Sequence, residues 1–392
     1  MIQRSNYLDL ITEVFDIHSV CALLGPRQCG KTTLARLYAE QIYKNKSEVH
    51  YFDLEHPRDL NALSSPSLTL EPLNGLIIID EIQRQPDLFP YLRYLSDYSD
   101  KKFLILGSAS RDLIHQSSET LAGRISYIEL SPFWLKEVGD FRKHWQRGGF
   151  PKSYLASSDT ASERWRFDYI TTFLERDLAN IGFSANPSLM RRLWAMVAHY
   201  HGQTVNYSEI GRSLDLTDKT IKRYLEILEG AFMIRLLKPW FENLGKRQVK
   251  SPKVYVRDSG LLHSLLDINS GNLTTHPKIG ASFEGYALEE VIRSLNLDKA
   301  QVYFWATEKG AELDLLVIQG DKRYGYEFKF SDSPTISKSM RIAQEDLKLS
   351  HLTIINPGNH SYKLESEISV IGLENFTNSF SDNQKLEAGK KQ

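Results

Sequence analysis

The chain has 392 residues, and at about 150 residues per domain this length predicts two or three packed domains. Hydrophobic residues make up 41% of it and charged residues 25%, a composition that excludes wholesale disorder. The formal net charge of −1 excludes a protein that is basic over its whole surface. With two cysteines there is no disulfide framework, and no apolar stretch approaches the roughly 20 residues of a membrane span. We therefore expect a cytoplasmic protein that does not enter the membrane.

Residues 1–140 alternate short apolar runs with helical stretches, a pattern typical of a parallel sheet built from βαβ units. The run GLIIID is apolar through four consecutive positions, as expected for a strand covered by helices on both faces. The sequence therefore predicts an α/β fold with a P-loop type of parallel sheet. We expect strands over residues 20–24, 49–54, 76–79, 103–106 and 125–130.

The first strong motif is GPRQCGKT at residues 25–32, which matches GxxxxGK[ST] between a predicted strand and a predicted helix. Such a loop turns backbone amides toward phosphate oxygens at a helix N-terminus. Lys31 is then expected to reach the β and γ phosphates and Thr32 to bind Mg²⁺. The predicted ATP-binding residues are Gly25, Pro26, Arg27, Gln28, Cys29, Gly30, Lys31, Thr32 and Thr33.

Further candidate catalytic residues follow the next predicted strands. Asp80 and Glu81 end the strand LIIIDE, where we expect Asp80 near the metal and Glu81 to activate the attacking water. Ser108 ends the strand FLILGS and is placed to sense the γ phosphate. Arg124 in LAGR is either a surface arginine or a cationic finger that one subunit supplies to its neighbour.

These motifs are followed along the chain by GGFP and YITTFLERDLANI. In the order of this series the chain resembles a widespread group of prokaryotic AAA-type ATPases that carry a C-terminal domain of unknown function. The likeness covers residues 1 to about 370. It implies an ASCE-type ATPase core, with Lys31 and Thr32 on the phosphates and the metal, Asp80 on the metal and Glu81 as the base.

After a helical connector over residues 141–187, residues 188–255 are predicted to form a winged helix-turn-helix module. Residues 188–253 hold twelve basic and six acidic side chains, a local balance of +6. The predicted second helix turns Lys219, Lys222 and Arg223 outward, where they suit phosphates or base edges of DNA. A role in protein interaction, or a cationic face that only solvent contacts, remains the alternative.

Residues 256–373 are predicted to form a small α/β domain, and residues 374–392 a disordered tail. A hairpin carries Asp314 on one strand and Glu327 with Lys329 on the other, and Glu284 lies on a preceding helix. This set resembles a PD-(D/E)xK nuclease-like site, in which carboxylates hold Mg²⁺. A purely structural role and a nuclease-like fold without cleavage are the alternatives.

The sequence thus predicts an ATPase that uses ATP and Mg²⁺, forms a homo-oligomer, and couples hydrolysis to the binding or remodelling of DNA. Two other functions fit the same residues. One is a metal-dependent nuclease that the ATPase gates. The other is a switch that uses its ATP state to hold a protein partner and does not touch DNA.

Overall fold

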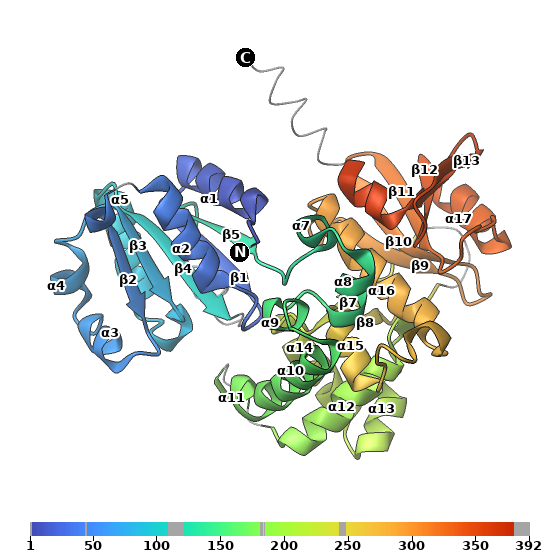
Figure 1. Cartoon of the computed structure of the whole chain (residues 1–392), viewed down its shortest axis with the longest axis horizontal. Coiled ribbons are helices and arrows are strands. Elements are labelled where there is room, and N and C mark those ends of the chain that lie inside the picture. The colour runs from blue at the N-terminus through green and yellow to red at the C-terminus, as the bar shows by residue number, and fades with distance from the viewer. Residues whose placement is uncertain are drawn as a thin grey trace. The chain divides into compact units, whose positions relative to one another are not determined.

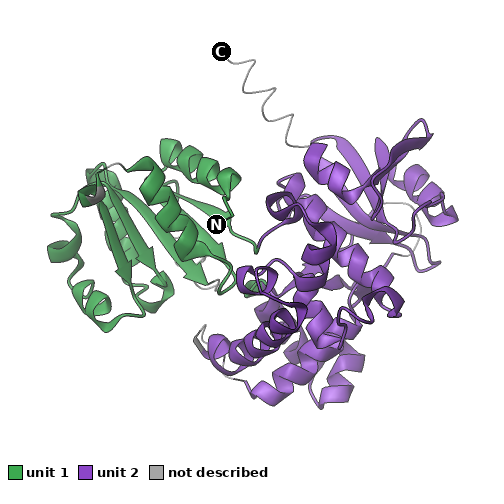
Figure 2. Ribbon diagram, viewed as in Figure 1, with its two compact units in different colours: residues 1–132, 230–232 green, residues 133–229, 233–392 purple. Residues whose placement is uncertain are grey.

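The structure is a computed structural model that describes residues 2–43, 45–108, 121–180, 183, 185–242 and 248–379. The chain folds into two compact units (Figure 2). Unit 1 comprises residues 1–132 and 230–232, and unit 2 comprises residues 133–229 and the chain from residue 233 onward. Within the described residues we find no helix with the length and apolar character needed to cross a membrane.

Unit 1 is built on a sheet of five parallel strands in the order β2-β3-β4-β1-β5 (Figure 1). All five predicted strands are present, and they form the parallel sheet that the sequence predicted. The strands are β1 (Val20–Gly25), β2 (Val49–Asp53), β3 (Leu76–Asp80), β4 (Lys102–Ser108) and β5 (Ile125–Glu129).

Alternate residues of these strands enter two separate cores, one on each face of the sheet, because neighbouring side chains of a strand point to opposite faces. In β3, Leu76 and Ile78 pack with one core, and Ile77 and Ile79 pack with the other. Each such buried side chain contributes about 1.5–3 kcal/mol. The helices of unit 1 are α1 (Ser5–Ile17), α2 (Lys31–Ile42), α3 (Pro57–Ala62), α4 (Pro66–Leu70) and α5 (Leu88–Tyr98), with the short 3₁₀ helices η1 (Lys46–Glu48) and η2 (Ile82–Arg84).

Unit 2 begins with a run of helices, as predicted for the connector. At η3 the hydrogen bonding of the helix changes to the wider π pattern, over the motif FLERD. The elements are α7 (Leu135–Val138), α8 (Phe141–Arg147), α9 (Pro151–Tyr154), α10 (Asp159–Thr172), η3 (Phe173–Asp177), α11 (Leu178–Asn180) and α12 (Pro187–His199).

The next segment contains two further helices and a three-stranded antiparallel sheet in the order β6-β8-β7. Helix α13 ends at Leu214, and the next residue, Asp215, caps it in the left-handed conformation with φ 57°. Helix α14 buries Ile221, Leu225 and Leu228, the three residues predicted for its inner face. The elements are α13 (Tyr207–Leu214), α14 (Asp218–Gly230), β6 (Gln203–Thr204), β7 (Ile234–Leu237) and β8 (Lys253–Val256).

The last part of unit 2 contains a six-stranded sheet in the order β13-β14-β12-β11-β10-β9. The predicted hairpin is formed by β10 and β11, with Gly320 at φ 63° in its two-residue turn. The elements are α15 (Ser259–Leu265), η4 (Leu273–Thr275), α16 (Ile279–Ser294), β9 (Val302–Ala306), β10 (Glu312–Gln319), β11 (Lys322–Phe328), α17 (Lys338–Leu347), β12 (His351–Asn356), β13 (Ser361–Glu365) and β14 (Ile368–Gly372).

The packed chain continues past residue 373, where the sequence placed the start of a disordered tail. Residues 373–379 are helical, and Phe376 and Thr377 are buried. The boundary of the tail was predicted too early because the segment is polar overall, and its composition does not indicate that these two side chains are buried. The rest of the predicted tail, residues 380–392, lies outside the described residues.

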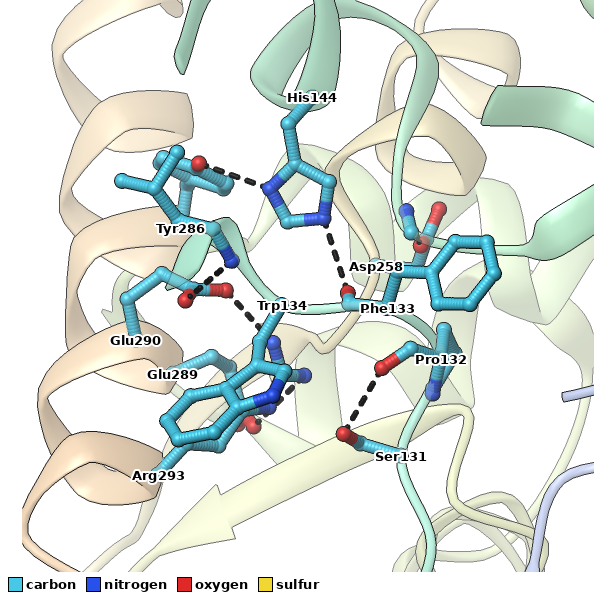
Figure 3. A network of polar contacts seen from close by, with 12 residues as sticks. Ser131, Pro132, Phe133, Trp134, His144, Asp258, Tyr286, Glu289, Glu290 and Arg293 are labelled. Atoms are coloured by element: carbon cyan, nitrogen blue, oxygen red, sulfur yellow. Dashed lines mark hydrogen bonds and ion pairs between the residues drawn. The ribbon is translucent and has the colours of Figure 1, made fainter. Parts of the chain in front are cut away.

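The chain enters unit 2 through a buried polar network (Figure 3). His144 Nε2 donates to the carbonyl of Phe133 at 2.9 Å, so Nδ1 is the acceptor for the Tyr286 hydroxyl at 2.8 Å. Glu290 accepts the amide of Leu135 at 2.9 Å. Burial lowers the pKa of His144 to about 3 and raises that of Glu290 to about 7. Both side chains are therefore held neutral at weakly acidic pH, and together they fix the backbone of residues 133–135.

Beside this network, three arginines share one buried carboxylate. Glu289 Oε1 is 2.5 Å from Arg235 Nε, and Oε2 is 3.2 Å from Arg257 and 3.6 Å from Arg293. Burial alone would raise the pKa of Glu289, but the guanidinium groups outweigh it and hold that pKa well below its ordinary value. The carboxylate thus joins β7, the segment after β8 and α16.

Candidate functional site

The GPRQCGKT loop joins the carboxyl end of β1 to the first turn of α2. A Cβ at Gly25 would lie 2.1 Å from the carbonyl oxygen of Leu130, so only glycine fits beside β5. Gly30 has φ 104°, a conformation that side-chain-bearing residues rarely adopt. These two glycines shape a loop that ends on the N-terminus of a twelve-residue helix. A loop of this kind presents backbone amides to an anion.

Lys31 is buried at the start of α2, and its ammonium group folds back over the loop. Its Nζ donates to the carbonyls of Gly25 and Pro26, both at 3.0 Å. These partners are neutral backbone oxygens. These two bonds hold the ammonium group of Lys31 at the loop, and a cation in this place suits the binding of phosphate.

Asp80 ends β3 and is the centre of a set of neutral donors. Its Oδ2 accepts the hydroxyls of Thr32 and Tyr51, each at 2.7 Å, and its Oδ1 accepts the amide of Glu81 at 3.0 Å. Burial and the neighbouring carboxylate of Asp80 raise the pKa of Tyr51, so this phenol stays a donor. The structure thus brings Thr32 and Asp80 together as the sequence predicted.

Glu81 follows Asp80 in the left-handed conformation, with φ 55°. Gln83 donates to its Oε2 and also to the hydroxyl of Ser108 at 3.0 Å, and Ser108 donates to the same carboxylate oxygen at 3.2 Å. Burial raises the pKa of Glu81, with Lys31 acting in the opposite direction. Among the described residues Gln83 Oε1 is buried without a hydrogen-bond partner.

The sequence missed Tyr51 and Gln83. Tyr51 lies on β2 opposite Ile78 of β3, and its hydroxyl reaches Asp80 across the strand pair. No local motif marks such a contact, because it depends on strand register. Gln83 was the easier residue to find, since it lies two positions after the predicted base in LIIIDEIQ.

The remaining loop residues differ in surroundings. Arg27 forms an exposed ion pair with Glu55 at 2.8 Å. Cys29 is buried in the core on the α1 and α2 side of the sheet, and burial raises its pKa. Thr33, next to Thr32, is exposed on α2. Cys29 is therefore a packing residue of the loop and not a free nucleophile.

Arg124 lies directly before β5, at the amino end of the sheet. β5 and β1 run parallel with Ile125 opposite Val20, whereas the loop follows Gly25 at the other end. A strand of five residues is about 16 Å long, which separates Arg124 from the loop of its own chain. Its guanidinium group binds Asp97 through two hydrogen bonds of 2.5 and 3.0 Å.

The candidate DNA-binding residues Lys219, Lys222 and Arg223 are all exposed on α14. The charge balance of their segment is less positive than its composition indicates, because Arg235 and Lys253 are buried in ion pairs with carboxylates outside it. Two more of the basic residues, Lys246 and Arg247, lie outside the described residues. The exposed cations that the structure describes in this segment are Lys219, Lys222 and Arg223 on α14 and Arg192, Arg212, Lys238 and Lys250 elsewhere.

The structure also gathers the predicted carboxylates of unit 2. Asp314 lies on β10, Glu327 on β11 and Glu284 on α16. Burial and the charge of Asp314 raise the pKa of Glu284 to about 7 and that of Glu327 to about 8. Within the described residues, however, no three acidic, histidine or cysteine side chains are placed to hold one metal ion. Lys253, a residue that the sequence analysis did not select for this cluster, contacts Glu284 and Asp314.

The fold and the loop of unit 1 define a P-loop protein of the AAA type. Residues 18–139 match the family described as AAA domain. Two further families match unit 2, both described as domains of unknown function: DUF8612 over residues 138–272 and DUF4143 over residues 279–376. The DUF8612 match covers the predicted connector and the predicted winged-helix module together.

Two relatives match this chain over nearly its whole length. Uncharacterized proteins of Mycobacterium tuberculosis and Mycobacterium bovis are each 46% identical over 376 residues, covering 95% of this chain and 84% of theirs. An uncharacterized protein of Haemophilus influenzae is 23% identical over 295 residues, covering 67% and 72%. The chain therefore belongs to the same family as these mycobacterial proteins, and its residues 18–139 form the AAA domain match.

Solved structures with partial likeness include a Walker-type ATPase of Pyrococcus abyssi, 16% identical with a TM-score of 0.47, covering 68% of this chain and 96% of that chain. AMPPCP-bound DnaA from Aquifex aeolicus is 13% identical with a TM-score of 0.29, covering 58% and 87%.

Proposed function

We propose that unit 1 binds and hydrolyses Mg-ATP and that the chain couples this reaction to the binding of DNA. The observation that carries the ATPase part is the joined set of Thr32, Asp80 and Glu81 beside the glycine loop. Its hydroxyl and carboxylate oxygens are ligands that Mg²⁺ prefers, so the residues present fit the ion. When bound, Mg²⁺ neutralises charge on the phosphate oxygens.

In this proposal each side chain has one task. The loop amides and Lys31 hold the phosphates, and Thr32 and Asp80 hold the metal. Glu81 takes the proton of the attacking water, a task for which its burial-raised pKa suits it. Gln83 and Ser108 orient the carboxylate through the hydrogen bonds described above.

Arg124 has a task only if a second copy of the chain supplies it. Its place at the amino end of the sheet excludes a contact with the loop of its own chain at this distance. The pair with Asp97 would have to open, because the same guanidinium group cannot serve both partners. We therefore assign Arg124 to the ATP site of a neighbouring subunit in a homo-oligomer. In the single chain Arg124 is held by its ion pair with Asp97.

The DNA part of the proposal rests on α14 and its surroundings. A helix that buries Ile221, Leu225 and Leu228 while exposing Lys219, Lys222 and Arg223, followed by a small antiparallel sheet, supports the winged-helix interpretation. Cations on the exposed face of such a helix contact DNA phosphates and base edges.

Hydrolysis is tested with Lys31→Ala and Glu81→Gln. Each variant is expected to lose at least about a hundredfold in ATPase rate, since each removes a group that acts on the reacting phosphate or water. Glu40→Gln, an exposed carboxylate on α2, is the matched control and should keep the parent rate. If either site variant hydrolysed ATP like the parent, the assignment would be wrong.

Coupling is tested by DNA binding of the Glu81→Gln variant with and without ATP. We expect ATP to change the affinity severalfold and the affinity to fall steeply with salt. Lys222→Ala should flatten the salt dependence, and Lys309→Ala, an exposed lysine elsewhere in unit 2, should not. A DNA affinity that changes neither with salt nor with Lys222→Ala would favour the protein-binding switch.

A further inference from the structure

Lys253 is a buried lysine at the start of β8 whose ammonium group lies among carboxylates from two other elements. Its Nζ is 3.4 Å from Glu284 on α16 and 3.5 Å from Asp314 on β10, and it also forms an ion pair with Glu312 on β10. Its side chain is only 3% exposed. A cation thus already lies between the two carboxylates that the sequence assigned to a metal.

The other groups of the cluster are also bonded within the chain. Tyr255 lies two residues after Lys253, on the same face of β8, and donates to Glu284 Oε1 at 2.7 Å. Glu327 pairs with Lys329 at 2.9 Å. Asp314 Oδ2 accepts the amide of Phe328 at 3.1 Å.

The ring of His201 links β8 to α16. A Cβ at Gly285 would lie 2.1 Å from Nε2 of His201, so the helix carries glycine where it meets this ring. His201 in turn accepts the amide of Val256 through Nδ1 at 2.9 Å. The strand that carries Lys253 is therefore fixed next to Glu284 by contacts independent of the ion pairs.

These residues do not fit a divalent cation. Mg²⁺ needs several oxygen ligands at about 2.0–2.1 Å in octahedral geometry. No three acidic, histidine or cysteine side chains are placed to hold one metal ion in the part of the chain that the structure describes, this cluster included. A metal bound by Glu284 and Asp314 would also have to displace a buried ammonium group that the backbone of β8 holds in place.

We propose that Lys253 takes the place of a metal ion in this cluster, and that the cluster is a metal-independent centre which fastens the three-stranded sheet to α16 and the six-stranded sheet. The nuclease-like set Glu284, Asp314, Glu327 and Lys329 then serves structure and not phosphodiester cleavage. This inference stands independently of the ATPase proposal, because it concerns unit 2 alone.

The first test measures the binding of Mn²⁺ to the full-length protein without nucleotide. Binding is detected as a decrease in the EPR signal of the free ion. We expect Asp314→Asn to bind as much Mn²⁺ as the parent. Asp80→Asn serves as the control for any ion at the loop of unit 1. An ion that Asp314→Asn loses and Asp80→Asn keeps would overturn the proposal, as would Mn²⁺-dependent nicking of plasmid DNA that needs Asp314.

The second test is thermal unfolding of Lys253→Met, with Lys309→Met as the exposed lysine control. Lys253→Met should lower Tm by about 5 °C or more or fail to fold, since it leaves buried carboxylates facing one another, whereas Lys309→Met should stay within about 1 °C. A Lys253→Met protein as stable as the parent would overturn the proposal. The Mn²⁺ measurement decides the metal question even if this variant does not fold.

Discussion

The carboxylates of the two units have different kinds of bonding partners. Around Asp80 and Glu81 the partners are hydroxyls, an amide side chain and a backbone amide, whereas Glu284, Asp314 and Glu289 of unit 2 are paired with lysine or arginine. Neutral donors leave the negative charge of Asp80 available to a metal ion. A cation that is part of the chain satisfies the carboxylate permanently. The contrast separates a site prepared for a ligand from clusters that hold the fold together.

The largest effect on stability is expected at Glu289. Glu289→Gln keeps the size of the side chain but removes the charge that Arg235, Arg257 and Arg293 share. We expect a loss of about 3–5 kcal/mol in unfolding free energy, typical of a broken buried ion pair. All six tryptophans lie in unit 2, so tryptophan fluorescence in a denaturant titration reports this loss directly. Glu345→Gln, exposed on α17, should change it by less than about 0.5 kcal/mol.

His144 and Glu290, two buried residues of the network in Figure 3, predict opposite pH dependences for two variants. Folding lowers the pKa of His144 to about 3. Below pH 6.5 the unfolded chain therefore binds a proton at this residue that the folded chain does not bind, and the stability of the fold decreases as the pH decreases. Folding raises the pKa of Glu290 to about 7, so between pH 7 and 4.5 the folded chain binds the extra proton and stability rises as pH falls.

As the pH is lowered from 6.5 to 4.5, the stability of His144→Gln should therefore increase relative to that of the parent. The stability of Glu290→Gln should decrease relative to that of the parent over the same range. Each change should approach about 1.4 kcal/mol per pH unit, measured in the same denaturant titration. Parallel curves for the two variants would show that unit 2 does not hold these groups neutral.

A smaller effect, on catalysis, is expected at Gln83. Gln83→Ala removes the amide that orients Glu81 against Ser108, and we expect kcat to fall about tenfold with KM for ATP within about twofold. Steady-state ATPase kinetics measure both constants. The isosteric Gln83→Glu should lower kcat further, because it places a second carboxylate beside the base. An unchanged kcat in both variants would remove Gln83 from the site.

The smallest effect is expected at Tyr51. Tyr51→Phe removes one of the two hydroxyls on Asp80 Oδ2 and should cost about 1 kcal/mol of stability, the usual contribution of one hydrogen bond. Since Thr32 keeps its bond to the same oxygen, the ATPase rate should change by less than about fivefold. A loss as large as that of Lys31→Ala would show that Tyr51 itself acts on the ligand.

Sequence and structure agree best where the signal is local. The strands of unit 1 are apolar runs, and the loop residues follow from a motif whose glycines and lysine are adjacent in the chain. The inner face of α14 followed from helical spacing alone. Each of these features depends on neighbours within a few residues.

The contacts that decide chemistry were harder to predict, because they join distant segments. Tyr51 meets Asp80 through the register of β2 and β3. Lys253 meets Glu284 and Asp314 only once β8 packs on α16. In the sequence Lys253 was counted only as one of the twelve basic residues of segment 188–253. The only local hint was its place at the head of KVYV, a strand that is buried at all four positions.

The most direct test of the account counts metal ions with nucleotide present. Mn²⁺ binding is measured on the Glu81→Gln background with a non-hydrolysable ATP analogue, with Asp80→Asn or Asp314→Asn added. We predict one analogue-dependent Mn²⁺ per chain, lost with Asp80→Asn and kept with Asp314→Asn. An ion kept with Asp80→Asn, or lost with Asp314→Asn, would contradict the division between a ligand site in unit 1 and a self-neutralised cluster in unit 2.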